Sequence, residues 1–187
     1  MPLSLTEVED LIDSWELDPR LDTVPHATEL LATMSVGDPG RVDVLQVIAD
    51  HQSMRGDVDA ALATLDLAVD ASGEQADVVA AMRIGFLIEA GRGAEVESQL
   101  VELRRRGSAL PVEAVERVCD ALEQDNRLSE AQRWYTIALR DLDPRLDLPD
   151  QDETYLLFGR LRVRRALGLA SDSYDELARV LLEERHF

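Results

Sequence analysis

Apolar residues recur at intervals of three and four along most of the chain, a spacing that places them on one face of a helix. The pattern predicts one helix over residues 4–17, where Ser4 and Glu7 have the spacing of a capping box, and a second over residues 25–34. Further helices are expected in pairs. They run from Asp38-Pro39 to about residue 55, over residues 58–71, 75–90 and 94–106, from Pro111 onward, and over 129–142, 153–167 and 173–187. No segment shows the alternation of a strand, so the predicted fold class is all-α.

Three short turns separate the helices within successive pairs and recur every 35 residues. They are residues 56–61 (GDVDAA), 91–96 (GRGAEV) and 126–131 (NRLSEA). Sliding the chain by 35 residues also aligns apolar positions, among them Leu65, Leu100 and Tyr135. A fixed period of this length indicates an α-hairpin solenoid, in which each hairpin is too small to bury its own apolar face and must stack on the next.

The repeated pattern resembles the tetratricopeptide repeat family over residues 42–187. Unit one spans about 42–75, a degenerate unit two about 77–110 and unit three about 112–145; a fourth unit follows, with roughly six extra residues assigned near 169–173. The residues that carry the resemblance are Leu45, Ala49, Gly56, Ala61, Leu65 and Ala68 in unit one, and Val115, Cys119, Leu122, Ala131, Tyr135, Ala138 and Pro144 in unit three. The resemblance implies a solenoid of three to four repeats over residues 39–187. Residues 1–38 are expected to form an N-terminal helical cap or, because they carry nine carboxylates and one arginine, an acidic arm for a basic partner.

The 35-residue step is also similar to that of the pentatricopeptide repeat family, which binds RNA. The charge of this chain argues against nucleic acid as a partner. Its net charge is −19, and all 19 basic residues are arginine. Such an acidic surface repels phosphate backbones, whose binding depends on cationic side chains that displace counterions.

Signatures of catalysis and of metal or cofactor binding are absent from the sequence. It has no nucleophile elbow and no phosphate-binding glycine loop, and the three histidines (His26, His51 and His186) are far apart. The single cysteine, Cys119, occupies a small-residue position of the repeat and is predicted to be a buried small hydrophobe. We therefore expect no enzyme and no cofactor. With no signal peptide and no apolar run of the ~18 residues that span a membrane, a cytoplasmic protein is expected.

The resemblance also implies a binding face, because the first helix of each tetratricopeptide unit lines a concave groove. Carried over, the groove positions are Asp43, Gln46, Asp50, Ser53 and Met54 in unit one; Val78, Ala81, Gly85, Ile88 and Glu89 in unit two; Glu113, Glu116, Asp120, Glu123 and Gln124 in unit three; and Glu153, Leu156, Arg160, Val163 and Arg164 in unit four. The two-carboxylate clamp of some family members needs Lys, Arg and Asn at these positions. Here they carry Asp and Gln, so that activity is not expected.

Four carboxylates of unit three share one helix face, since Glu113, Glu116, Asp120 and Glu123 are spaced three, four and three apart. Either a basic partner neutralises this stripe, or Arg160 and Arg164 of unit four do so from the adjacent row. The expected function is a non-enzymatic scaffold or adaptor that binds a protein segment, in the first case a basic peptide. A secretion-type chaperone and an RNA-binding helical-repeat protein are the alternatives, and a homodimer through Leu181, Leu182 and Phe187 stays open.

Overall fold

The computed structural model describes residues 3–18, 21–68 and 71–184 of the 187-residue chain. Within these ranges the protein is all-α, with ten α-helices, one short 3-10 helix and no strand. The elements are α1 (Leu5–Leu17), α2 (Thr23–Thr33), α3 (Arg41–Met54), α4 (Val58–Leu65), α5 (Gly73–Glu89), α6 (Gly93–Arg104), η1 (Gly107–Ala109), α7 (Val112–Gln124), α8 (Leu128–Ala138), α9 (Gln151–Ala166) and α10 (Ser173–Glu184).

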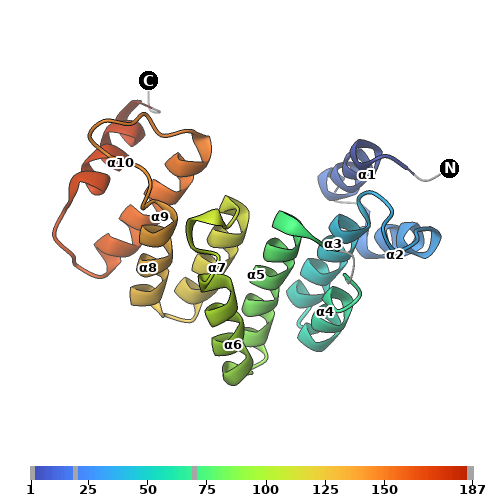
Figure 1. Cartoon of the computed structure of the whole chain (residues 1–187). Coiled ribbons are helices and arrows are strands. Elements are labelled where there is room, and N and C mark those ends of the chain that lie inside the picture. Colours follow the sequence, from blue (N-terminus) through green and yellow to red (C-terminus); the bar gives the residue numbers. More distant parts are fainter. Residues whose placement is uncertain (1–2, 19–20, 69–70, 185–187) are drawn as a thin grey trace.

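Apart from α6 and α7, helices that follow one another in the sequence pack against one another, as expected for helical hairpins. In addition, α3, α5, α7 and α9 pack in that order, each against the next but one in the chain. Figure 1 shows the result: α4, α6 and α8 lie along one side of the row, and the two end hairpins rise on either side of an open space above α5 and α7.

The three recurring turns have the same geometry, which confirms the period. Gly56, Gly91 and Asn126 all adopt positive φ angles, of 83°, 68° and 59°. The residue after each donates its N–H to a carbonyl five residues earlier, a bond that closes the preceding helix. These bonds are Asp57 to Gln52 (2.9 Å), Arg92 to Leu87 (2.9 Å) and Arg127 to Leu122 (2.7 Å).

The hairpin α1–α2 joins the row through α3. Val8 and Ile12 of α1 and Ala27 of α2 share a small apolar cluster with Val44 and Ile48 of α3. The predicted capping box of α1 is confirmed. The Ser4 hydroxyl accepts a hydrogen bond from the Glu7 N–H (3.3 Å), and the Glu7 carboxylate accepts one from the Ser4 N–H (2.8 Å).

Contrary to expectation, the next helix does not begin at Asp38-Pro39. Gly40 is the N-cap, with φ of 73°, and α3 begins at Arg41. A side chain at position 40 would come within 2.7 Å of Cβ of Val8, so the chain passes against α1 before it can turn into α3. Packing against α1 thus overrides the local start signal of Asp38-Pro39.

Two outer helices end earlier than predicted. Helix α4 ends at Leu65 and not near residue 71, although residues 69–70 lie outside the described ranges; α8 ends at Ala138 and not near residue 142. Ala68, Leu139 and Leu142 are nevertheless buried. They reach the core from turns, so the apolar spacing continues beyond the helix.

Cys119 is buried, which confirms that it is a small core residue, and Trp134 and Tyr135 are buried as well. Burial raises the pKa of the Cys119 thiol well above its usual range, so this side chain is a poor nucleophile.

Candidate functional site

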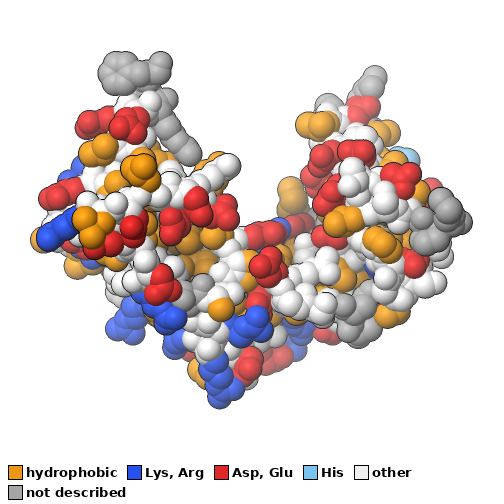
Figure 2. Space-filling model, turned by 45° about the horizontal axis from the view of Figure 1, so that its top comes forward, with side chains coloured by type: hydrophobic (Ala, Val, Ile, Leu, Met, Phe, Trp, Pro, Cys, Tyr) orange, Lys and Arg blue, Asp and Glu red, His pale blue; other side chains and the backbone are white. Residues whose placement is uncertain are grey.

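The faces of α3, α5, α7 and α9 that point into the open space form a groove with three hollows. The first, of about 320 Å³, lies between α1, the start of α3 and α5; the second, of about 220 Å³, lies over α5 between α3 and α7; the third, of about 240 Å³, lies between α7 and α9. Asp120 lines both the second and the third, which therefore lie next to each other. Figure 2 shows acidic side chains along the inner walls of the open space, whereas arginine side chains gather on the outer face below.

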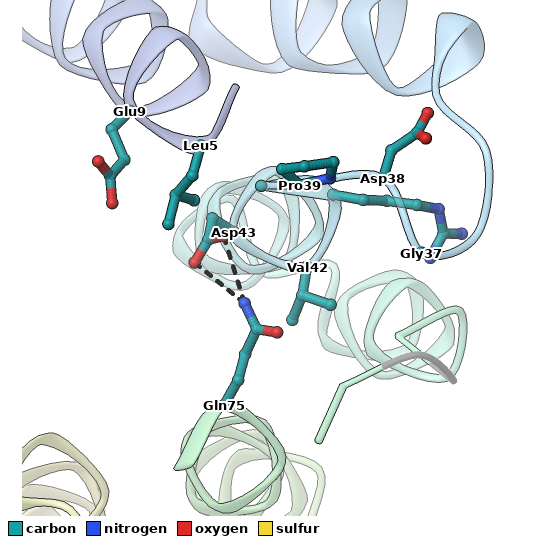
Figure 3. A pocket seen from close by; sticks show the side chains of 10 residues that line it. Leu5, Glu9, Gly37, Asp38, Pro39, Val42, Asp43 and Gln75 are labelled. Carbon is teal, nitrogen blue, oxygen red and sulfur yellow. Dashed lines mark hydrogen bonds between the residues drawn. The ribbon is translucent and has the colours of Figure 1, made fainter. Parts of the chain in front are cut away.

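The first hollow combines carboxylates with apolar side chains. Figure 3 shows Asp43 on α3 accepting a hydrogen bond from the amide of Gln75 on α5 (3.3 and 3.4 Å to the two oxygens). Gln46, also predicted for the groove, is half-buried on the same helix. The other side chains that line this hollow are Leu5, Glu9, Asp38, Pro39, Val42 and one cation, Arg41.

The second hollow exists because α5 carries small residues where it passes between α3 and α7. Ala81 and Gly85 form part of its lining, as predicted. Val78 and Ile88 are not among its lining residues, and the larger apolar side chains present are Met82 and Phe86.

Side chains of α3 and α7 meet across this small-residue surface. Arg117 of α7 lies 3.5 Å from the Asp50 carboxylate of α3 and 3.1 Å from Glu113 on its own helix. Near the same hollow, Ser53 donates a hydrogen bond to Glu89 of α5 (2.6 Å).

The acidic stripe of α7 is partly neutralised by a side chain of α9. That side chain is Arg162 and not Arg160 or Arg164. This guanidinium donates two hydrogen bonds to Glu123 (3.0 and 2.8 Å) and lies 3.5 Å from Asp120. Glu116 makes no hydrogen bond or ion pair within the described residues.

Arg160 and Arg164, the residues that the sequence assigned to this role, lie elsewhere. Arg160 is 4% exposed and bonds to Asp172 (2.8 Å) and Asp175 (3.2 Å), ahead of and within α10. Arg164 contacts the same two carboxylates, at 3.1 and 3.0 Å. The acidic stripe is therefore not answered by these two arginines.

The difference is a register shift of two residues in the fourth unit. In the first three units the last groove position comes two residues before the turn residue at 56, 91 or 126. Gly168 has φ of 67°, and the Leu169 N–H bonds to the carbonyl five residues earlier, so 168 is the equivalent turn position. Counting back from it puts Tyr155, Phe158 and Arg162 in the groove.

The third hollow carries these side chains, which sequence reasoning had not assigned to the site. Its lining contains three aromatic rings, two carboxylates, one arginine and one glycine: Tyr135, Tyr155, Phe158, Glu116, Asp120, Arg162 and Gly159. The extra residues of unit four lie in two places. The segment 139–150 before α9 is longer than the equivalent segments 66–72 and 105–111, and the segment 167–172 between α9 and α10, close to the predicted position, is longer than 55–57, 90–92 and 125–127. Gly168 was the sequence signal that could have located them.

Three groove carboxylates have raised pKa values. Burial is the main cause at Asp50, Glu116 and Asp120, and at Glu116 the neighbouring carboxylates Asp120, Asp152 and Glu113 raise the pKa further. Attraction from Arg117 at Asp50, and from Arg162 at the other two, does not cancel this effect. The groove therefore holds negative charge that the fold only partly neutralises.

We expect Glu116→Gln to stabilise the protein at pH 7. Glu116 has like charges at positions i−3 and i+4, each of which costs roughly 0.2–0.5 kcal/mol on a helix, so the gain should be about 0.4–1 kcal/mol. Because the folded-state pKa of Glu116 lies above its unfolded value, ionisation destabilises the fold; this penalty disappears as the pH falls through the raised pKa toward the ordinary glutamate pKa of about 4.3.

Urea unfolding of both proteins at pH 7 and pH 4 measures this difference. Glu113→Gln is the matched control, since it also removes one stripe charge but breaks the contact with Arg117 and should bring no gain. Equal gains in the two variants, or a gain that persists at pH 4, would contradict this interpretation.

Within the described ranges, no group of three or more His, Cys, Asp or Glu side chains is placed to hold a metal ion, and no helix is long and apolar enough to cross a membrane. His186 and Phe187 lie outside these ranges. Leu181 and Leu182 are half-buried on α10.

Comparison of the chain with protein-family models and with curated proteins finds no match.

Proposed function

We propose that this protein is a non-enzymatic adaptor of the tetratricopeptide-like type, in which α1–α2 cap a stack of hairpins and the groove binds a basic segment of a partner protein. The observation that carries the proposal is the charge of the groove. Seven carboxylates on its helices are faced by Arg117 and Arg162, and a third arginine, Arg41, lines the first hollow and donates to the Leu67 carbonyl (3.0 Å). The carboxylates are Asp43, Asp50, Glu89, Glu113, Glu116, Asp120 and Glu123.

The cost of this charge to the stability of the fold favours a binding role for the groove carboxylates over a structural one. Like charges on α7 and the raised pKa values of Asp50, Glu116 and Asp120 oppose stability. A cationic segment would relieve this repulsion when it binds. Surface charge of one sign also steers an oppositely charged partner and makes the association weaken with salt.

The arginines of α9 give little support to RNA binding. Three of the four are engaged with carboxylates, Arg160 and Arg164 with Asp172 and Asp175, and Arg162 with Glu123; the fourth, Arg165, is exposed. The groove that they border is acidic, and a phosphate backbone would be repelled from it.

We expect a fluorescently labelled octa-arginine peptide to bind the full chain at low salt, measured by anisotropy, and to bind progressively more weakly as NaCl is added. An octa-glutamate peptide should not bind. Reversing two charges, with Glu116→Arg and Asp120→Arg together, should weaken octa-arginine binding at least tenfold, because it places like charges against the peptide.

The matched control changes the net charge equally at two exposed positions that line none of the three hollows, with Asp59→Arg and Asp125→Arg together. Circular dichroism checks that both variants fold. If the two pairs weaken octa-arginine equally, overall charge is responsible and the groove is not the binding site.

A further inference from the structure

The third hollow has three aromatic rings in its lining, whereas the second has one, Phe86, and the first has none. The third hollow brings rings of Tyr135, Tyr155 and Phe158 together with the carboxylates of Glu116 and Asp120. Its volume of about 240 Å³ gives room for a side chain rather than for a single water, whose share of liquid volume is about 30 Å³.

Aromatic faces and carboxylates together favour a cation. A purely apolar side chain would desolvate the two carboxylates without pairing them, and an acidic one would be repelled. A cation can contact the negative face of a ring and form an ion pair with a carboxylate at the same time.

We infer, on the basis of the proposed function, that the hollow between α7 and α9 is the anchor pocket for one arginine side chain of the bound segment. A guanidinium is flat, carries five donors and stacks on rings, whereas the lysine ammonium is compact and more strongly hydrated. The pocket presents both kinds of partner that a guanidinium uses.

The fold already holds one arginine, Arg160 of α9, between an aromatic ring and two carboxylates at the start of α10. The Arg160 guanidinium lies 4.8 Å from the ring centroid of Tyr174 and bonds to Asp172 and Asp175. With a further contact to the Thr136 hydroxyl (3.4 Å), one aromatic ring and two carboxylates surround this buried arginine, and the third hollow offers rings and two carboxylates on an open surface.

The side chains around the third hollow leave negative charge available there. Arg162 at its edge is committed mainly to Glu123, to which it makes two hydrogen bonds, and it is farther from Asp120 at 3.5 Å. Glu116 pairs with no side chain in the described part of the chain. In the second hollow, by contrast, Asp50 is paired with Arg117 and the lining has a single aromatic ring, Phe86, so that hollow offers fewer faces on which a guanidinium could stack.

The test uses the isotopically labelled full chain and three small probes followed by amide NMR shifts: the doubly blocked amides of arginine, citrulline and lysine. Citrulline has nearly the shape of arginine without its charge. Arginine amide should shift amides of α7 and α9 around the third hollow. Citrulline amide should bind at least tenfold more weakly and lysine amide severalfold more weakly.

Tyr155→Ala should weaken arginine amide binding about threefold to fivefold through loss of the stacked ring. Leu148→Ala is the matched control, because it also removes an exposed apolar side chain, 95% exposed, but from the segment before α9. It should leave the affinity unchanged.

The outcomes separate this inference from the function on which it rests. If arginine amide up to tens of millimolar moves no amide around the third hollow, or if citrulline amide binds equally, the anchor pocket is wrong. If octa-arginine still binds in that case, the acidic groove remains the proposed binding site, and the bound segment is anchored at another place in it. If wild-type protein does not bind octa-arginine either, the proposed function itself fails.

Discussion

Arg160→Met will lower the free energy of unfolding by about 3 kcal/mol. Arg160 is 4% exposed, and its closest partner in the core, Asp175, is 3% exposed. Removing one member of a buried ion pair leaves the other charge without compensation, which costs about 3–5 kcal/mol. We expect the lower end of this range because Arg164 would still contact Asp175, at 3.0 Å.

Urea unfolding followed by circular dichroism measures this loss. Arg165→Met is the control: Arg165 is exposed on the same helix, and its replacement should change the stability by less than about 0.5 kcal/mol. A stability for Arg160→Met within 0.5 kcal/mol of wild type would mean that the Arg160 cluster contributes little to the fold.

Charge acts in opposite directions in this cluster and in the groove. At Asp172, burial raises the pKa, but hydrogen bonds from Arg160 and from the Asp175 N–H outweigh it, and the net pKa is lowered. Ionised Asp172 therefore stabilises the fold above its unfolded pKa, and this contribution is lost as the pH falls through the lowered value. Glu116 has the reverse sign, since its ionisation destabilises the fold. Carboxylates that serve the structure are thus distinguishable from groove carboxylates whose charge is only partly neutralised.

The repeat was readable from the sequence because it is local. A residue with positive φ must follow the first helix of each hairpin, and Gly56, Gly91 and Asn126 are residue types that adopt this conformation readily. Apolar spacing supplied the helices, and Ser4 and Glu7 fixed the start of α1. Each of these signals depends on neighbours within about five residues.

The register of the fourth unit could not be read in the same way. The segment 139–150 before α9 carries extra residues that shift the register of α9, and no pattern within a few residues reveals their number. A shift of two residues moves a side chain about 200° around a helix of 3.6 residues per turn. Arg160 consequently lies in the core while Arg162 faces α7.

Ion pairs between distant segments were beyond the sequence pattern as well. Arg117 meets Asp50 only because Ala81 and Gly85 between them are small, and Arg162 meets Glu123 across 39 residues. Such pairings depend on the spacing of packed helices and on the reach of long side chains. The acidic character of the groove was predictable, but the extent to which the fold neutralises it was not.

Gly159→Ala will destabilise the protein by about 1–3 kcal/mol, although alanine is the better helix former. A Cβ atom at position 159 would lie 2.6 Å from Cε1 of Tyr135, inside van der Waals contact. Tyr135 is 2% exposed and is held by Glu123 and Arg162 at its hydroxyl, so the ring has little freedom to move away. The absent side chain allows α9 to approach α8 and keeps the third hollow open.

Gly85→Ala on α5 is the matched control, and it should act in the opposite direction. There the added Cβ would meet only the Cβ of Ala121, at 3.8 Å, so the gain in helix propensity of roughly 0.5–1 kcal/mol should appear as added stability. In a Tyr135→Leu background the ring is gone, and Gly159→Ala should become neutral or stabilising. Urea unfolding of the four proteins of this double-mutant cycle measures the coupling between the two sites. If Gly159→Ala has the same effect on stability with and without the Tyr135 ring, the contact between Gly159 and Tyr135 does not set the spacing of α8 and α9. Relief of the clash is the only reason for the effect of Gly159→Ala to differ between the two backgrounds.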